Sequence, residues 1–394
     1  MPIVTRVYRS VQRLLRRTPL SSAETLLVHQ VVAGISEKKS CHRSEIGRAC
    51  GLPEPLIRTE RRLSKQLGRD RSALDALPEA WLRHVAAHAR AMPYVSVDLS
   101  EIAKPHGRAF EYLDWVSDRS QPHPPTVPGY WYVSIEANDE ARHHVPLTVE
   151  LFSTQDPTYA GWMETVHRTI ARVVRAVGTG ATWLLDRGFD DASTMRVLDG
   201  FDLSWVIRLK KSRDVEVGDP AAPQRWNVAG FAKNLRKPYS VTLPYVDKST
   251  HVLRSMGLSF GYAPVRIDGR RYTLIVVTGT RSEDWRLLTN KSVRTWKNVA
   301  ALVRAYVARW GGEEWIRCVK QCTSFEDVRV RGFASLRRML LLAMIAMGIQ
   351  ALWLLRRSKV TERLLGRVKS FFATVPFLHD RLWEGTADAL AHGS

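Results

Sequence analysis

One segment, residues 304–322, constrains this chain more than any other, and its sequence is RAYVARWGGEEWIRCVKQC. In a helix that turns about 100° per residue, one phenol, one carboxylate and two cations of this segment share a stripe about 60° wide. These residues are Tyr306, Arg309, Glu313 and Lys320. The stripe is either a solvated helix face with charge pairs or a metal-binding carboxylate flanked by groups that bind phosphate. Partner carboxylates elsewhere in the chain would favour the second interpretation.

Two aspartates stand where such partners are expected. Asp98 ends the apolar run PYVSVD, and Asp186 ends the run ATWLLD. A buried strand holds a carboxylate at its carboxyl end rigidly, while the following turn leaves that carboxylate open to substrate. Taken alone, each aspartate is better explained as a turn or helix-cap residue. The functional interpretation therefore rests on the whole set of acids.

The spacing of the polar stripe resembles a known signature. Two residues separate Tyr306 from Arg309, and three separate Arg309 from Glu313. Six more residues precede Lys320. This pattern is similar to the Tyr-Arg-Glu-Lys signature of insertion-sequence DDE transposases.

Two further matches extend the resemblance to roughly residues 90–345. Asp98 in YVSVD and Asp186 in LLDRGF resemble the first and second aspartates of that family. The segment WRLLT, which starts at Trp285, resembles a strand upstream of the family's glutamate. The match has one departure, because the family usually has a bulky aliphatic residue just before the glutamate.

Glycines occupy that place here. Gly311 and Gly312 each cost a helix about 1 kcal/mol relative to alanine, so the helix bends or restarts near the expected ligand. The ligand is therefore Glu313 or Glu314, and the spacing favours Glu313.

The resemblance implies a ribonuclease-H-like catalytic core that binds two divalent cations, Mg²⁺ or Mn²⁺. The implied ligands are Asp98, Asp186 and Glu313. Carboxylates suit this role because Mg²⁺ prefers hard oxygen ligands. In a two-ion site, one ion activates the nucleophile and the other stabilises the leaving oxygen.

The resemblance also assigns residues to DNA. Arg309 and Lys320 would neutralise phosphate near the cut, and Tyr306 would donate a hydrogen bond to it. Trp285 and Trp310 match places where the family has tryptophans associated with a base flipped out of the duplex. Simple aromatic packing is the alternative for both tryptophans.

The charge of the chain points to a polyanionic partner. The 394 residues carry a formal net charge of +20, and the isoelectric point is near 10.2. Such a surface attracts nucleic acid. Acidic lipid is the competing partner, but the basic residues are spread along the chain instead of flanking one apolar helix. Charge thus favours nucleic acid, and the resemblance implies that the partner is double-stranded DNA, both element ends and target, bound by a homodimer in a synaptic complex.

Cysteines and apolar segments bear on the compartment. Four cysteines, unevenly placed, do not make a disulfide framework, which favours a reducing compartment. The basic amino terminus has no secretory apolar core. Residues 339–355 are mostly apolar but short for a membrane span and basic at both ends, which favours a buried helix. We expect a prokaryotic cytoplasmic protein associated with the nucleoid and no membrane partner.

Residues 1–88 are predicted to be a helical DNA-binding domain. Within it, residues 44–67 have the pattern of a helix-turn-helix, with Ser44 as a cap, a turn at Gly51 and a second helix from about Glu54. The apolar positions assigned to this bundle include Leu52 and Ile57. A generic helical hairpin with solvated charges is the alternative. The second helix would present Arg58, Arg61, Arg62 and Lys65 to DNA.

The rest of the chain is predicted to be an α/β catalytic core with an insertion. Residues 89–210 show the order β, β, β, α, β, α, β, which is that of the ribonuclease-H-like fold. Residues 211–290 form a β-rich insertion, residues 291–345 complete the core, and residues 346–394 are a C-terminal helical region. The long separation between Asp186 and Glu313 requires such an insertion.

Together these features predict a DNA transposase that binds transposon ends, hydrolyses phosphodiester bonds with two metal ions and transfers the 3′ hydroxyl to target DNA. Two alternatives remain. A structure-specific nuclease could use the same core without strand transfer, and a domesticated DNA-binding regulator could have lost catalysis.

Overall fold

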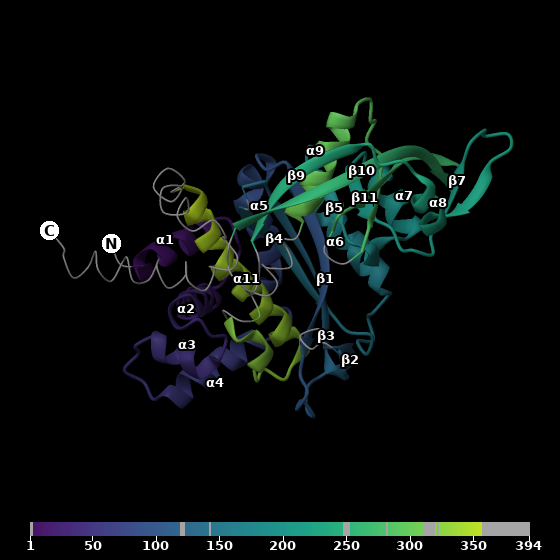
Figure 1. Cartoon of the computed structure of the whole chain (residues 1–394). Helices are drawn as coiled ribbons and strands as arrows, with labels where there is room; N and C mark the ends of the chain where they lie inside the picture. The colour runs from purple at the N-terminus through teal and green to yellow at the C-terminus, as the bar shows by residue number, and fades with distance from the viewer. Residues whose placement is uncertain are drawn as a thin grey trace.

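The computed structural model describes residues 3–118, 123–141, 143–246, 253–280, 283–309, 320 and 323–356. These residues form a helical amino-terminal part and one 12-stranded mixed sheet with helices packed on it (Figure 1). The predicted α/β class is confirmed at this level.

The described residues ahead of the first strand form helices. They are α1 (Ile3–Leu15), α2 (Ser22–Lys38), α3 (Arg43–Ala49), α4 (Leu56–Leu67), the 3₁₀ helix η1 (Ala73–Ala76) and α5 (Leu77–Arg90). Apolar residues recur on α2 at the spacing of helical turns, and Leu27, Val31 and Ile35 are buried. Helix α2 begins in a capping box between Ser21 and Glu24, which satisfies backbone donors of its first turn.

The predicted helix pair of residues 44–67 is present as α3 and α4, with corrections at its start and turn. His42, not Ser44, is the N-cap of α3, since the backbone N–H of Ile46 already donates to the His42 carbonyl. Gly51 has φ +56, so the turn uses the left-handed backbone that glycine allows. Pro55 is the N-cap of α4, which begins two residues later than predicted.

Two apolar residues of this pair lie outside the core, contrary to the prediction. Leu52 is 39% exposed and Ile57 is 53% exposed. Because α4 begins at Leu56, Ile57 lies in its first turn on the outer side of the pair.

The sheet runs in the order β2-β3-β1-β5-β6-β12-β11-β10-β7-β8, with β4 on β3 and β9 on β10. Its strands are β1 (Tyr94–Ala103), β2 (Asp114–Ser117), β3 (Thr126–Asn138), β4 (His144–Phe152), β5 (Thr182–Leu185), β6 (Ser204–Arg208), β7 (Asp214–Val217), β8 (Gln224–Asn227), β9 (Tyr239–Val246), β10 (Leu253–Ile267), β11 (Arg270–Thr278) and β12 (Trp285–Thr289).

Parallel pairing occurs at the centre of the sheet. β1 pairs parallel with β5 and β5 pairs parallel with β6, whereas β1 and β3 are antiparallel. Parallel neighbours need a crossover, and here α6 (Trp162–Val177) and α7 (Ala192–Gly200) supply one before and one after β5. The carboxyl ends of β1, β5 and β6 therefore lie at the same edge.

The strands between residues 214 and 289 continue this sheet. β12 joins β6 in antiparallel pairing, and β11 and β10 follow it as a long hairpin. Residues 253–256 and 263–267 belong to the same long strand, β10. Gly261 permits the close approach of a neighbouring segment, since a Cβ there would lie 1.9 Å from the Arg236 carbonyl oxygen.

Two buried clusters cover the two faces of the central strands. Trp183 and Leu185 of β5 belong to the cluster that also contains α5, α6 and α11 (Phe333–Arg356). Leu184, between them in the chain, belongs to the cluster that contains α9 (Trp296–Ala308). This alternation along β5 is that of a strand with both faces covered.

The long apolar helix α11 lies between the amino-terminal helices and the sheet (Figure 1). Residues 333–355 are long and apolar enough to cross a membrane, but 78% of the apolar window is buried against the rest of the protein. Gly348 fits against the indole of Trp81, where a Cβ would lie 2.3 Å from a ring carbon. The helix runs unbroken through residues 345 and 346, where a boundary between parts was predicted.

Candidate active site

Asp186 directly follows strand β5, whereas Asp98, predicted to end a strand, lies in the middle of β1 at the point where its parallel pairing with β5 stops. Val97 of β1 pairs with Leu185 of β5, and this is the last pair between the two strands. Each aspartate is the next residue in its chain segment after that pair. Asp186 follows Leu184 by two residues and therefore continues the face that α9 covers. Asp98 is 9% exposed, and Asp186 is half-buried. The sheet thus brings together two acids that are 88 positions apart in the sequence.

Helix α9 presents two residues of the polar stripe to these aspartates. The Nη1 of Arg309 lies 3.1 Å from Oδ1 of Asp98. The Tyr306 hydroxyl donates a long hydrogen bond of 3.5 Å to Oδ1 of Asp186. The Arg309 guanidinium also lies over the Tyr306 ring, at 5.3 Å from its centroid. Tyr306 is wholly buried and Arg309 is 2% exposed, so both side chains are fixed by packing.

Burial shapes the chemistry of the tyrosine. It raises the pKa of Tyr306 well above that of a free phenol, with the nearby Arg309 acting in the opposite direction. The hydroxyl is therefore protonated at neutral pH and can donate a hydrogen bond.

The polar stripe is preceded by a well-defined helix start. Thr295 caps α9, and its side chain and that of Asn298 form a capping box. Helix α9 begins at Trp296 and has Arg309 as its C-cap. The predicted residues Glu313 and Trp310, and the alternative ligand Glu314, lie outside the described residues.

Trp285 is at the predicted strand start but lies inside the protein. It is 1% exposed and meets the Tyr306 ring edge to face at 5.5 Å. Its neighbours are the apolar residues of the cluster beneath α9. In this structure the indole supports Tyr306, and its contact with a flipped base stays a prediction.

Lys320 lies near a different acid of β1. Its Nζ is 3.0 Å from Glu101 and 3.2 Å from Glu326. Glu326 belongs to the 3₁₀ helix η3 (Phe325–Asp327), and the buried Lys104 bonds the backbone carbonyls of that helix. A phosphate contact of Lys320, which stays a prediction, would have to share or replace these two carboxylates.

The four predicted cations of the helix pair lie on α4. Arg58, Arg61 and Lys65 are exposed along it. Arg62 is half-buried and donates to Gln30 at 2.8 Å and to Glu54 at 3.1 Å. Three of the four side chains are therefore accessible to a binding partner, whereas Arg62 links α4 to α2 and to the turn before α4.

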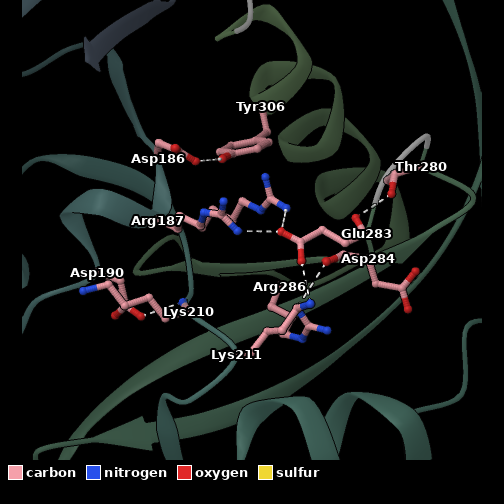
Figure 2. A network of polar contacts seen from close by, with 11 residues as sticks. Asp186, Arg187, Asp190, Lys210, Lys211, Thr280, Glu283, Asp284, Arg286 and Tyr306 are labelled. Atoms are coloured by element: carbon pink, nitrogen blue, oxygen red, sulfur yellow. Dashed lines mark hydrogen bonds and ion pairs between the residues drawn. The ribbon is translucent and has the colours of Figure 1, made fainter. Parts of the chain in front are cut away.

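A cluster beside Asp186 could not be predicted from the sequence (Figure 2). Glu283 Oε1 accepts from Arg187 at 2.8 Å and from Arg208 at 2.6 Å, and Glu283 Oε2 lies 2.9 Å from Lys211. Hydrogen bonding to Lys211 is the main reason that the pKa of Glu283 is lowered. The sequence motif around Asp186 includes Arg187 but none of its partners. Glu283 follows Arg187 by 96 residues, so no local pattern links the two.

The two aspartates fit part of a divalent-cation site. Both offer hard oxygen ligands, and they belong to adjacent strands, each one residue beyond the last paired position of β1 and β5. Within the described residues no three histidine, cysteine, aspartate or glutamate side chains gather closely enough to hold a metal. The third predicted ligand falls outside those residues. Asp98 and Asp186 are therefore the described part of the predicted ligand set.

Comparison with known proteins places the chain in a family. No curated protein matches the sequence. Among solved structures, the piggyBac transposase in a synaptic complex with hairpin DNA is similar at 11% identity with a TM-score of 0.42. That alignment covers 90% of this chain and 66% of the other, just under two thirds of its length.

A family model provides the stronger match. The transposase DDE domain matches residues 140–349, a range that includes Asp186, Tyr306, Arg309 and the position of Glu313. Asp98 precedes the matched range, although β1 pairs with β5 inside it. Because the match covers more than half of the chain, this protein belongs to the family of transposases with a DDE domain.

Proposed function

We propose that the protein is a DNA transposase that binds the ends of a mobile element, cleaves phosphodiester bonds and joins the freed 3′ hydroxyl to target DNA. The observation that carries this proposal is the placement of Asp98 and Asp186 on the adjacent strands β1 and β5, each one residue beyond their last paired position, with Arg309 on Asp98 and Tyr306 on Asp186. Membership of the transposase DDE domain family supports the same reaction class.

The fold supports a ribonuclease-H-like core. In the order β4-β3-β1-β5-β6, the first three strands are antiparallel neighbours and the last three are parallel neighbours. This arrangement corresponds to the order predicted for residues 89–210. The proposed domains keep the bounds 1–88, 89–210, 211–290, 291–345 and 346–394, with the second and fourth forming the core.

In the proposed mechanism Asp98, Asp186 and Glu313 hold two divalent cations, Mg²⁺ or Mn²⁺. When bound, such ions supply an activated water or hydroxyl and stabilise the leaving oxygen. Tyr306 fixes the orientation of the Asp186 carboxylate through its hydrogen bond. Arg309 binds Asp98 and would neutralise a phosphate brought to the two aspartates.

DNA binding would use other parts of the surface. The exposed Arg58, Arg61 and Lys65 of α4 suit contacts with the duplex at the element end. We propose two copies of the chain in a synaptic complex, as cleavage and joining of two ends require. The net charge of +20 supports DNA as the partner, and we propose that the protein acts in the cytoplasm at the nucleoid.

Alanine substitutions test the catalytic assignment. Asp98→Ala, Asp186→Ala and Glu313→Ala should each abolish cleavage and leave DNA affinity nearly unchanged, because each removes a metal ligand and no phosphate contact. The assay is nicking and joining on a duplex that contains the junction between the element and its flank. Supplying a pre-cut end and a target plasmid separates a transposase from a nuclease that cannot join strands.

The same experiment settles the register of the third ligand. If Glu314→Ala abolishes cleavage while Glu313→Ala retains it, Glu313 is the wrong residue. A wild-type protein that binds the junction but cuts nothing with Mg²⁺ or Mn²⁺ would support the non-catalytic regulator instead.

A further inference from the structure

The cluster around Glu283 contains more positive charge than its single acid can balance. Arg187, Arg208 and Lys211 all lie within 2.9 Å of that carboxylate. The four side chains together keep a formal charge of +2. Exposed ion pairs contribute little to folding stability, so stability gives a weak reason to gather three cations at one place.

The cluster is open to solvent and hollowed. The Arg187 and Lys211 side chains are 55% and 64% exposed, whereas Arg208 is 14% exposed. A cavity of about 330 Å³ beside them is lined by Arg187, Lys211 and Glu283 together with Leu209 and Arg286. A ligand in this cavity can therefore reach Arg187 and Lys211 directly, and it reaches Arg208 at the place that the Glu283 carboxylate now occupies.

The backbone ties the cluster to Asp186. Arg187 is the next residue in the chain and begins the 3₁₀ helix η2 (Arg187–Phe189). The Phe189 N–H donates to the Asp186 carbonyl at 3.0 Å, which fixes this turn. Arg208 ends β6, the strand beside β5. In the view of Figure 2, Arg187 lies below Asp186, and Glu283 lies further to the right, below Tyr306.

We propose that Arg187, Arg208 and Lys211 form a binding site for a DNA backbone phosphate and that Glu283 occupies this site until DNA displaces it. The proposal rests on the proposed function, since it places this phosphate next to the one cleaved. A phosphodiester carries one negative charge over two oxygens, as a carboxylate does, so it can replace Glu283 with the same donors. Glu283 keeps the cations assembled and competes with DNA for them.

Binding measurements without divalent cations test the proposal. The probe is a fluorescent duplex of about 40 base pairs that spans the junction between the element and its flank. Glu283→Gln keeps the shape of the side chain but removes the competing charge. It should bind the probe more tightly, and the slope of log K against log salt should steepen by about 1.

Two cation variants complete the test. Arg187→Ala and Lys211→Ala should each weaken binding and flatten the slope by about 1, because each removes one cation that binds phosphate. Glu164→Gln is the matched control, since Glu164 is exposed on α6, which packs on β3 and β4. It removes the same charge elsewhere and should leave the slope unchanged.

The outcomes separate this proposal from the function on which it rests. Equal or weaker binding by Glu283→Gln, or an equal gain by Glu164→Gln, would overturn the phosphate site even if the wild type cuts and joins DNA. Tighter binding by Glu283→Gln with no cleavage by any variant would instead uphold the site and reject the transposase reaction. Thermal unfolding of each variant shows that it is folded.

Discussion

Arg309 and Asp98 illustrate how single residues of this site depend on one another. A carboxylate that is 9% exposed is costly to bury without a cation, and Arg309, itself 2% exposed, supplies one at 3.1 Å. In the proposed reaction, Asp98 would bind a divalent cation and Arg309 a phosphate in place of each other. The signature spacing predicts Tyr306 and Arg309 on one side of a helix, but only the sheet shows that each reaches a different aspartate.

Trp285 calls for a more careful substitution than alanine. Removing a buried indole costs about 3 to 5 kcal/mol, which would confuse a catalytic effect with unfolding. We expect Trp285→Leu, which keeps more apolar volume, to slow hairpin formation or second-strand cleavage and to spare the first nick. A fluorescent base analogue near the cut should brighten less than with the wild type.

Trp205 provides the control for that prediction. It is equally buried but belongs to the cluster on the other face of the sheet, where it packs against Tyr272 at 5.2 Å. Trp205→Leu should lower stability without changing the brightening. Equal brightening with wild type and Trp285→Leu would leave Trp285 a packing residue.

The Glu24 carboxyl makes the stability of the amino-terminal helices depend on pH. Burial raises the pKa of its carboxyl, but hydrogen bonds from Ser21, Ser72 and Ala73 outweigh this and lower the pKa to about 2. An unfolded glutamate has a pKa near 4.5. The stabilisation is therefore complete above pH 4.5 and is lost as the pH falls from there towards 2.

We expect Glu24→Gln to lower the free energy of unfolding by about 1 to 3 kcal/mol at neutral pH, because an amide cannot accept all of these donors. The decrease in wild-type stability between pH 4.5 and 2 should shrink in the variant. Denaturant titrations at several pH values measure both effects. Glu79→Gln, in the exposed first turn of α5, is the control and should behave as the wild type does.

At the scale of elements, helix α4 has three exposed cations that can contact DNA and one, Arg62, whose hydrogen bonds stabilise the fold. Replacing Arg58, Arg61 and Lys65 together by alanine should reduce the salt slope of end binding by roughly 1 for each phosphate that the protein no longer binds. Arg62→Ala should instead lower stability, since it removes the bonds to Gln30 and Glu54. Filter or fluorescence binding across a salt series measures the slope.

Exposed arginines of α6 are the control for this set. Arg168 and Arg175 replaced by alanine remove similar charge from another surface and should leave end affinity nearly unchanged. A wild-type slope in the α4 variant would exclude α4 from DNA recognition. Point variants are preferable to removing residues 1–88, because α2 and α4 cover α11.

At the scale of the whole molecule, sequence patterns predicted individual strands and helices better than they predicted which strands pair. Apolar runs before Asp98 and Asp186 predicted two strands, and their parallel pairing follows from the crossover helix between them. No pattern indicated that residues 214–289 continue the same sheet, because pairing of β12 with β6 depends on contacts across about 80 residues. The partners of Glu283 could not be predicted for the same reason, because they precede it by more than 70 residues.

Local signals also failed where packing decided the outcome. Ile57 fits an apolar pattern but faces solvent, because the start of α4 sets its direction. Residues 333–355 resemble a membrane span in composition, but the short apolar run with basic flanks predicted a buried helix, and the structure buries this helix between α2 and β4. The sequence therefore predicted those site residues that belong to a motif of fixed spacing. It did not predict residues that only the folded chain brings to the site.

The position of α11 bears on how this protein is made. Arg338 of α11 binds Asp75 at 2.9 Å and donates to the carbonyls of Leu67 and Arg69, so the helix completes a core that begins some 270 residues earlier in the chain. During translation the amino-terminal helices leave the ribosome long before their cover does. A product that stops before residue 333 would keep α4 and its cations but leave apolar faces of α2 and α4 uncovered. Such truncated chains would aggregate or be degraded instead of occupying element ends.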